Sequence, residues 1–544
     1  MLDIILKNCS VIDGVSDTAY LADIGIMDDI IIKVGNLKEY KAVTTIDCQG
    51  KFAAPGFIDV HSHSDLNPFI DNGFDSKLRQ GVTTEIIGNC GYSVYPLKGE
   101  FAEKVKKEAD SYDITVNWES LEGYVNEIRT RGKLALNIIP LAGLSAVRTY
   151  VNGYNSRALN NKEIGLIKQI IDEMMLQGAF GVSSGMIYPP CCYFEPEELF
   201  QIISTVAKHN GVYTTHMRSE SDGLLEALNE TLQITRRTGV NTQISHLKTA
   251  EKHNWHKIDS VFELIEEAIK DGFNVSADRY PYLASQTSLD MVLPKWVFDG
   301  GDEMAVRRLL DPIVSQKIRS EILKYHSINS DYWENIIVSQ IHTPEFKKYE
   351  GLNFTQIYGF VKSLKSHCQK FDIIDALFFF LACEKMKTSA IFFNMCEKNL
   401  EKILGKNYVM IGSDATARTL TGPLAEGKPH PRAFSTFVKY LTDFVTRKHL
   451  FSLPKAISKI TYLPAQKFNI FGRGRIAPSF YADIVIFDLN NLKDNSNYVN
   501  PFNYPDGMEL VIINGKVAFD QKDSLKTKNK SYNGRVILRN ENAK

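Results

Sequence analysis

The stretch FIDVHSHSD, residues 57–65, joins a short apolar run to two histidines that stand two positions apart. In an extended strand, side chains at i and i+2 point the same way, so His61 and His63 project together from the end of this strand. A buried strand does not need that pattern, whereas zinc is commonly held by imidazoles. The stretch therefore predicts a β-strand that leads into a metal site, with a pair of polar loop histidines as the alternative.

From about residue 56 to about residue 465, apolar strand-like runs alternate with longer amphipathic stretches. The strand candidates are FIDVHSH, TTEIIGNCG, LALNIIPLAG, GAFGVSSG, VYTTHMR, NTQISHLK, NVSADRYPY and YVMIGSDA. Three of the helical stretches between them end in glycine, the expected helix stop: KEIGLIKQIIDEMMLQG, SDGLLEALNETLQITRRTG and IDSVFELIEEAIKDG. This alternation predicts an α/β protein whose catalytic domain is a (β/α)₈ TIM barrel over residues 56–465.

The two ends of the chain have a different sequence pattern. Residues 1–55 and the segment 466–544 consist of short β-branched runs separated by Gly, Asp and Asn turn signals; ADIVIFD, LVIINGKVAFD and GRVILR are the C-terminal examples. Since the termini of a domain often lie close together, the two segments are expected to form one small β-sandwich domain. Residues 285–345 interrupt the barrel pattern and are expected to be an insertion, which we interpret as a lid.

The bulk properties restrict the class of protein. A chain of 544 residues exceeds the usual size of one hydrophobic core, and its formal net charge of −1 argues against nucleic-acid and membrane partners. No apolar run approaches the ~20 residues of a spanning helix, and the most apolar stretch, DALFFFLAC, is expected to be a core helix. The first residues do not resemble a secretory signal, and eight cysteines do not make a disulfide scaffold in so long a chain. We expect a cytoplasmic protein; the oligomeric state stays open.

Other strand candidates also end in groups that bind metals. Cys90 ends TTEIIGNC, His216 ends VYTTH, His246 ends NTQISH and Asp414 ends YVMIGSD. Each alone has a structural explanation, such as a buried packing cysteine or a turn aspartate. In a TIM barrel, however, the carboxyl ends of all strands meet on one face, where active sites lie. Five strand ends with metal-compatible side chains therefore indicate a catalytic metal centre.

Several stretches resemble the N-acyl-D-amino-acid deacylases, or D-aminoacylases, of the amidohydrolase superfamily. They span nearly the whole chain in the family's order: APGFIDVHSHSD, GVTTEIIGNCGYSVYPL, GAFGVSSGMIYPP, YTTHMRSES, QISHLK, ADRYPYLASQTSLD, MIGSDA, KPHPRAFSTF and ADIVIFD. GNCG is the most diagnostic, because many amidohydrolases use a carboxylated lysine where this subgroup has a cysteine. The resemblance implies zinc-dependent hydrolysis of an N-acyl-D-amino acid, a small-molecule substrate, to a carboxylate and the free D-amino acid.

The resemblance also implies roles for individual residues. The implied ligands fall into a tight zinc site and a second position of uncertain occupancy: Cys90, His216 and His246 form the first, and His61, His63 and Asp414 the second. Whether one or two metals bind is left open. Asp414 is the implied general base for the attacking water, and the resulting acid then protonates the leaving amine.

Four further residues are implied to bind the substrate. Lys248 in SHLK, Tyr280 in RYPY and Arg432 in HPR are implied ligands of the free carboxylate, and Tyr188 in MIYPP lies near the scissile carbonyl. An arginine fork, a lysine charge and a tyrosine hydroxyl suit a carboxylate. Exposed surface charges are the alternative for Lys248 and Arg432, and core packing is the alternative for the two tyrosines.

Two further observations concern the surroundings of this site. In HMRSES, Arg218 and Glu220 are expected to form an ion pair that orients His216. The chain departs from the family pattern at Leu144, in AGLSAVR, and at Gln286, in LASQT. Neither departure removes an implied ligand, but both leave the substrate preference open.

Three alternatives to a general D-aminoacylase remain. A cyclic-amide hydrolase of the hydantoinase or dihydroorotase type would place a bridging lysine where Cys90 stands. A deacylase for N-acyl-D-glutamate or N-acyl-D-aspartate would need one more cation for the side-chain carboxylate. A non-catalytic metal-binding or ligand-binding barrel would be marked by loss of Asp414 or of a ligand, and all six implied ligands are present.

Overall fold

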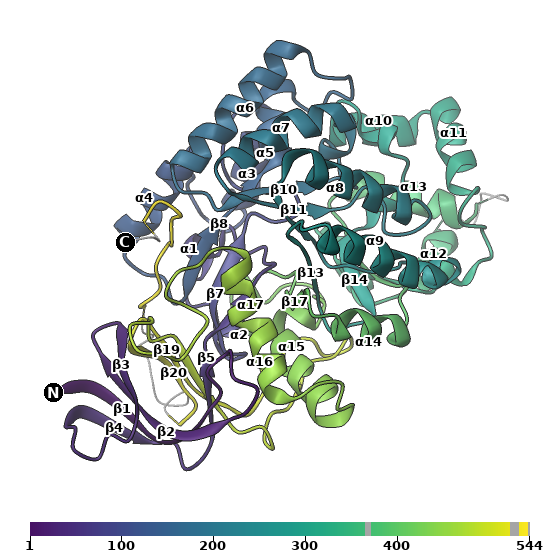
Figure 1. Ribbon diagram of the computed structural model, residues 1–544. Coiled ribbons are helices and arrows are strands. Elements are labelled where there is room, and N and C mark those ends of the chain that lie inside the picture. The colour runs from purple at the N-terminus through teal and green to yellow at the C-terminus, as the bar shows by residue number, and fades with distance from the viewer. Residues whose placement is uncertain (365–370, 523–531, 542–544) are drawn as a thin grey trace.

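A computed structural model describes residues 1–364, 371–522 and 532–541 (Figure 1). Its centre is a parallel barrel, which confirms the predicted (β/α)₈ fold. The barrel strands in order are β6 (Phe57–Asp59), β7 (Val82–Ile87), β8 (Asn137–Pro140) with its continuation β9 (Ala142–Gly143), β10 (Gly181–Gly185), β11 (Val212–His216), β12 (Asn241–Ile244), β13 (Val275–Arg279) and β17 (Val409–Ile411). A parallel bridge between Ser62 and Ala415 closes the ring between the first strand and the last.

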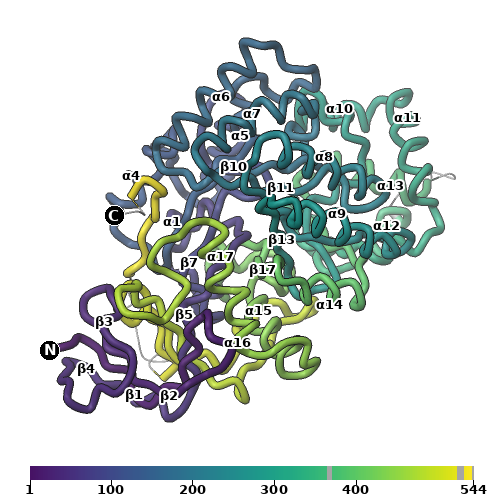
Figure 2. The backbone as a smooth tube through the Cα atoms, viewed as in Figure 1, coloured from purple at the N-terminus to yellow at the C-terminus, as the bar shows by residue number. Residues whose placement is uncertain are grey.

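Helices follow the strands and surround the barrel (Figure 2). They include α2 (Asp75–Leu78), α4 (Leu121–Arg131), α6 (Asn161–Leu176), α7 (Pro196–Lys208), α8 (Leu224–Thr238), α9 (Ile258–Lys270), α14 (Glu397–Gly405) and α15 (Arg432–Lys439). The three helices predicted from periodicity are α6, α8 and α9. Helix α8 ends where expected, because Gly239 takes a left-handed conformation, with φ of 69°, that glycine adopts at little cost.

A small β domain combines strands from the N-terminal and C-terminal segments of the chain and lies at the lower left in Figure 1. Its strands are β1 (Leu2–Val11), β2 (Tyr20–Met27), β3 (Ile30–Gly35), β4 (Ala42–Asp47), β5 (Phe52–Pro55), β18 (Ile484–Phe487), β19 (Met508–Ile513) and β20 (Lys516–Asp520). Antiparallel pairing of β5 with β18 joins the N-terminal strands to the C-terminal ones. The expectation for GRVILR is wrong: Val536 bridges Ile138 of β8, so this segment lies against the barrel.

The insertion after β13 builds a unit with its own hydrophobic core. Its antiparallel sheet has the order β14 (Ala284–Ser288), β16 (Ser389–Phe393), β15 (Ile336–Gln340), and its helices include α10 (Asp302–Leu310), α11 (Pro312–Ile322), α12 (Phe354–Leu364) and α13 (Ile373–Cys383). The core of this unit runs from Leu289 to Phe392, so the insertion continues beyond the expected limit at residue 345. Helix α13 is the predicted apolar core helix, and Asp372 caps its first turn.

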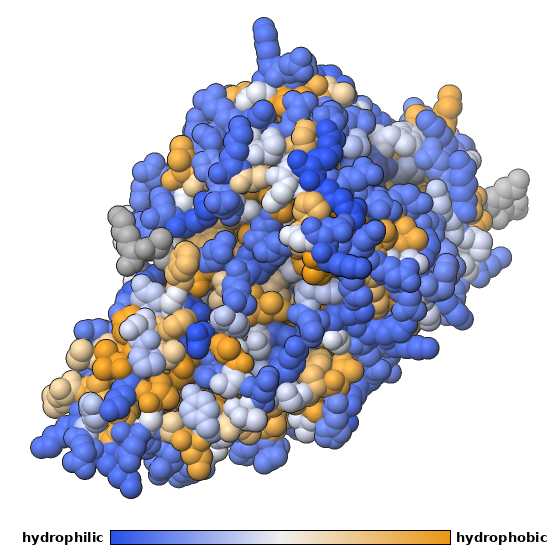
Figure 3. All heavy atoms as spheres, viewed as in Figure 1, coloured by the Kyte–Doolittle hydropathy of each residue, from blue (hydrophilic) through white to orange (hydrophobic). Residues whose placement is uncertain are grey.

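Polar and charged side chains cover most of the face shown in Figure 3. Within the described ranges, none of the helices combines the length and the apolar character that crossing a membrane requires. The barrel brings the carboxyl ends of its strands together next to the insertion, and the predicted metal residues are found there.

Candidate metal centre

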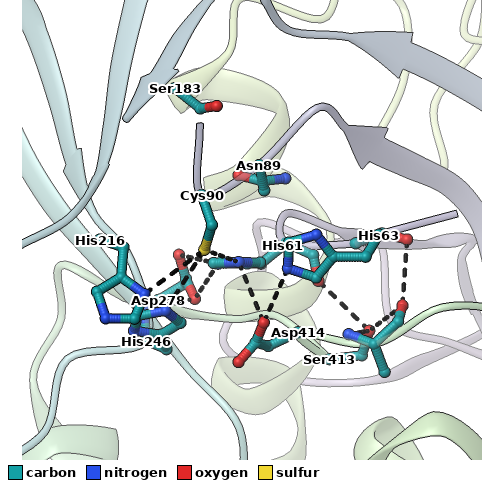
Figure 4. A network of polar contacts seen from close by, with 12 residues as sticks. His61, His63, Asn89, Cys90, Ser183, His216, His246, Asp278, Ser413 and Asp414 are labelled. Atoms are coloured by element: carbon teal, nitrogen blue, oxygen red, sulfur yellow. Dashed lines mark hydrogen bonds and ion pairs between the residues drawn. The ribbon is translucent and has the colours of Figure 1, made fainter. Parts of the chain in front are cut away.

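The side chains that were predicted to bind metal meet at the carboxyl ends of the barrel strands (Figure 4). His61 follows β6, Cys90 follows β7, His216 ends β11, His246 follows β12 and Asp414 follows β17. All five residues are buried. Five segments that are far apart in the sequence thus contribute sulfur, imidazole and carboxylate groups to one place.

The separations around Cys90 suit a metal ion. Its Sγ lies 3.8 Å from His216 Nδ1, 3.6 Å from His246 Nε2 and 3.2 Å from His61 Nε2. A tetrahedral zinc ion holds sulfur at about 2.3 Å and nitrogen at about 2.0–2.1 Å, which places two such ligands about 3.5 Å apart. Cys90, His216 and His246 therefore fit three ligands of one zinc ion. A set of one sulfur and two imidazole nitrogens is typical of zinc.

A second set of side chains extends the centre. Asp414 Oδ1 lies 3.4 Å from His61 Nε2 and 3.0 Å from His63 Nε2. The ligand atoms of His61, Cys90, His246 and Asp414 all lie within 4.8 Å of one another; His63 and His216 are outside this group, and His216 forms a second group with Glu220 and His246. The structure thus places His63 beside Asp414, at the edge of the centre.

The backbone at three of these strand ends is held in an uncommon conformation. Cys90, His246 and Asp414 have positive φ angles of 51°, 35° and 51°. The left-handed region is costly for residues other than glycine, and such residues gather at functional sites. Two buried hydrogen bonds hold these turns, because His246 N donates to Asp278 Oδ1 and Asp414 N donates to His61 O. The conformation aims all three side chains into the centre.

Asp278, at the end of β13, orients His61. Its Oδ1 lies 3.2 Å from His61 Nδ1, and its Oδ2 accepts a hydrogen bond of 2.6 Å from Gln243 Nε2. A proton on Nδ1 leaves Nε2 of His61 as the nitrogen that faces Cys90. Sequence reasoning missed this residue; the only signal was a carboxylate within the buried strand VSADR.

Glu220 has the same role for two other histidines. Its Oε2 lies 3.4 Å from His216 Nε2, and its Oε1 lies 2.9 Å from His246 Nδ1 and 2.5 Å from Lys248 Nζ. The carboxylate therefore faces the ring nitrogens that point away from Cys90. Such partners fix the orientation and tautomer of ligand histidines.

The expected ion pair between Arg218 and Glu220 is not formed. Arg218 instead pairs with Glu230 at 2.8 Å and donates to the carbonyl oxygens of Cys192 and Phe194. It reaches these partners because the chain turns immediately after β11. Glu220 is thus left to contact the histidines directly, without an arginine between them.

Electrostatics favour ionised ligands. Burial alone would raise the pKa of the Cys90 thiol, but the charge of His61 and a hydrogen bond from His216 help to bring that pKa well below its usual value. Burial would also raise the pKa of Asp414, yet the charges of Arg432, His61 and His246 together outweigh it and hold the pKa well below the usual range. The centre therefore presents a thiolate and a carboxylate, the forms that bind metal.

A cavity of about 860 Å³ opens onto the centre and is lined by Tyr188, Lys248, Tyr280 and Arg432. Arg432 Nη1 lies 2.8 Å from Asp414 Oδ2, while its Nε is buried and has no hydrogen-bond partner among the described residues. The buried hydroxyl of Tyr280 also has no partner in the described part of the chain. These unpartnered donors need an acceptor, and a substrate carboxylate entering the cavity would provide one.

The other two cavity residues already have partners. Lys248 is engaged with Glu220 and His246, so it acts on the cavity mainly through its charge. The Tyr188 hydroxyl lies 2.9 Å from Thr287 Oγ1, and the ring packs edge-on against His216 with 5.0 Å between ring centres. Tyr188 thus forms part of the wall beside the centre.

Known proteins share this fold. The crystal structure of N-acyl-D-glutamate deacylase from Bordetella bronchiseptica, complexed with zinc and a phosphonate mimic of the tetrahedral intermediate, superposes with a TM-score of 0.81 at 26% identity and covers 99% of both chains. The sequence model of the amidohydrolase family matches residues 387–518. The matched segment is similar to the amidohydrolase family, and the fold of the whole chain is similar to that of the deacylase.

Two curated relatives match this chain over almost its full length. D-aminoacylase from Alcaligenes xylosoxydans xylosoxydans is 29% identical over 525 residues, which is 96% of this chain and 95% of that protein. N-acyl-D-glutamate deacylase from the same organism is 28% identical over 525 residues, 96% of this chain and 94% of that protein. The chain is therefore a metal-dependent hydrolase.

Proposed function

We propose that this protein hydrolyses the amide bond of N-acyl-D-amino acids and releases a carboxylate and the free D-amino acid. The observation that carries the proposal is the juxtaposition of Cys90, His216 and His246 at zinc-ligand spacing with Asp414 and Arg432. The D stereochemistry is taken from the relatives, which are named D-aminoacylase and N-acyl-D-glutamate deacylase.

We place one tightly held zinc ion at Cys90, His216 and His246, and a weaker second position at His61 and Asp414 with His63 beside it. When bound there, zinc would lower the pKa of a water molecule to about 7 and would polarise the amide carbonyl. The chain contributes the thiolate and the oriented imidazoles, since Glu220 and Asp278 face the outer ring nitrogens.

Asp414 is the proton carrier in this proposal. Its carboxylate is ionised, lies at the end of β17 and borders the cavity. It accepts a proton from the attacking water as the carbon–oxygen bond forms. It then gives that proton to the amide nitrogen as the carbon–nitrogen bond breaks, so the amine leaves as a neutral group.

Arg432 and Tyr280 position the substrate through its free carboxylate. Arg432 presents a buried Nε and Tyr280 a buried hydroxyl, both without a partner in the described structure. Lys248 adds a positive charge nearby, with its ammonium 6.0 Å from the Tyr280 ring centre. Tyr188 borders the position of the scissile carbonyl.

The test is a screen of paired N-acetyl-D- and N-acetyl-L-amino acids with added zinc. We expect turnover of D substrates that ceases when zinc is removed by a chelator and returns when it is restored. Turnover of hydantoin or dihydroorotate without turnover of linear amides would instead favour a cyclic-amide hydrolase. Bound zinc without any amide hydrolysis would favour a binding protein.

A further inference from the structure

The cavity wall contains five lysine and arginine side chains, and four of them are paired with carboxylates. The pairs are Lys104 with Asp302 at 3.3 Å, Arg218 with Glu230 at 2.8 Å, Lys248 with Glu220 at 2.5 Å and Arg432 with Asp414 at 2.8 Å. The fifth cation is Lys295. Across the part of the chain that the structure describes, no carboxylate forms an ion pair with its ammonium group.

Lys295 is half-buried, which makes an unpaired charge costly. Burial lowers its pKa to about 8, and the nearby charges of Cys192 and Asp290 only partly offset this effect. The side chain is still mainly protonated at neutral pH. A positive charge therefore borders the cavity, and no carboxylate of the described residues is ion-paired with it.

The backbone of Lys295 is hydrogen-bonded, whereas its ammonium group forms no ion pair among the described residues. The residue begins a short 3-10 turn, Lys295–Phe298, in the insertion after β14. Its carbonyl oxygen accepts a hydrogen bond of 3.0 Å from the Tyr193 hydroxyl, which ties the insertion to the turn after β10. The ammonium is thus presented from the insertion side of the cavity, whereas Arg432 and Tyr280 belong to the barrel.

We propose that Lys295 binds a second carboxylate of the substrate, in addition to the one that Arg432 and Tyr280 bind. The inference rests on the proposed deacylase function and narrows its substrate class to N-acyl amino acids with two carboxylates. The second carboxylate belongs either to the amino-acid side chain, as in glutamate, or to the acyl group, as in a succinyl group. A bound carboxylate supplies the missing partner of Lys295, whereas a neutral analogue of equal shape leaves the ammonium unpaired.

Isosteric substrate pairs test this inference. N-acetyl-D-glutamate against N-acetyl-D-glutamine examines the side chain, and N-succinyl-D-alanine against N-succinamoyl-D-alanine examines the acyl group. We expect kcat/KM to favour the dicarboxylate of one pair by roughly tenfold to a hundredfold, the worth of a hydrogen bond to a charged group. Lys295→Met should abolish that preference and change the neutral member by about twofold or less, while Lys295→Arg should retain it.

Lys104→Met is the matched control, because Lys104 borders the same cavity but is paired with Asp302. It should leave the preference intact. Equal kcat/KM values within both pairs in the wild-type enzyme would overturn the inference, as would an equal loss on both members of a pair in Lys295→Met.

A binding measurement separates this inference from the proposed function. Calorimetry compares D-glutamate with D-glutamine, and succinate with succinamate, on the zinc-loaded wild-type protein and on Lys295→Met. A carboxylate preference that Lys295→Met removes supports the inference even if no N-acyl-D-amino acid is hydrolysed, a result that would refute only the proposed function. Equal binding within both pairs in the wild-type protein counts against the Lys295 site itself.

Discussion

Glu220→Gln tests how the metal centre is held in shape. The carboxylate faces His216 Nε2 at 3.4 Å, His246 Nδ1 at 2.9 Å and Lys248 Nζ at 2.5 Å. All three are donors when the two histidines bind a metal through their other nitrogens. Glutamine keeps the shape of the side chain but replaces one oxygen with an NH₂ group. In either orientation, that NH₂ group points a donor at another donor.

Two effects of different size follow. Loss of a carboxylate partner of a ligand histidine lowers metal affinity by about 10–100-fold, or about 1.4–2.7 kcal/mol. Lys248 is only 3% exposed, so removing its anion also leaves a buried charge uncompensated, at a cost of up to about 3–5 kcal/mol in the free energy of unfolding. The first effect acts on zinc binding, and the second acts even on the metal-free protein.

The assay is a competitive chelator titration for zinc affinity, together with urea unfolding of the metal-free protein. The double variant Glu220→Gln/Lys248→Met removes the ammonium as well, so it should regain stability while its zinc affinity stays low. Glu230→Gln is the control, because Glu230 pairs with Arg218 outside the centre. Wild-type zinc affinity in Glu220→Gln would refute the orienting role of this carboxylate.

Three other substitutions have expected outcomes. Asp414→Asn should keep the zinc of the Cys90 site but lower kcat by at least about 10²-fold, the usual contribution of a general base; near-normal kcat would remove that role. Cys90→Ala should lose tightly bound zinc, and an unchanged metal content measured by atomic emission would contradict its assignment as a ligand. Burial raises the pKa of Asp290 from its ordinary value of 3.8 to about 6, so the folded state holds this proton more tightly than the unfolded state. The stability that this carboxyl contributes is therefore present at low pH and lost as pH rises from about 4 through 6. Asp290→Asn should raise Tm more at pH 8 than at pH 5, by the equivalent of at most about 3 kcal/mol, and an equal change at both pH values would argue against this titration.

The barrel and the meeting of its strand ends could be predicted because both follow from periodicity. Parallel strands have their carboxyl ends on the same face, so a residue that ends an apolar run is placed without knowledge of any contact. This is why His61, Cys90, His216, His246 and Asp414 could be grouped from the sequence. Their approach to within a few ångströms also needs left-handed backbone conformations at Cys90, His246 and Asp414. The residue types at those positions do not predict such conformations.

Features set by loops could not be predicted. The partner of Arg218 depends on where the chain turns after β11, and that turn gives it Glu230 in place of Glu220. The end of the insertion was missed because α12 and α13 have the same apolar periodicity as barrel helices, although they pack on a separate core. GRVILR has the composition of a strand, but a short β-branched run does not reveal which edge it will join.

Gln286, a departure from the family pattern, lies where the insertion meets the barrel beside the cavity. Gln286 lies on β14, and its backbone oxygen accepts a hydrogen bond of 3.2 Å from Arg432 Nη2. Its side chain accepts from His430 N at 3.0 Å and donates to Ser339 Oγ on β15 at 3.0 Å. Arg432 is therefore held by Asp414 from the barrel and by β14 from the insertion. Because Lys295 lies in the same inserted segment, both proposed carboxylate sites depend on contacts that the insertion makes.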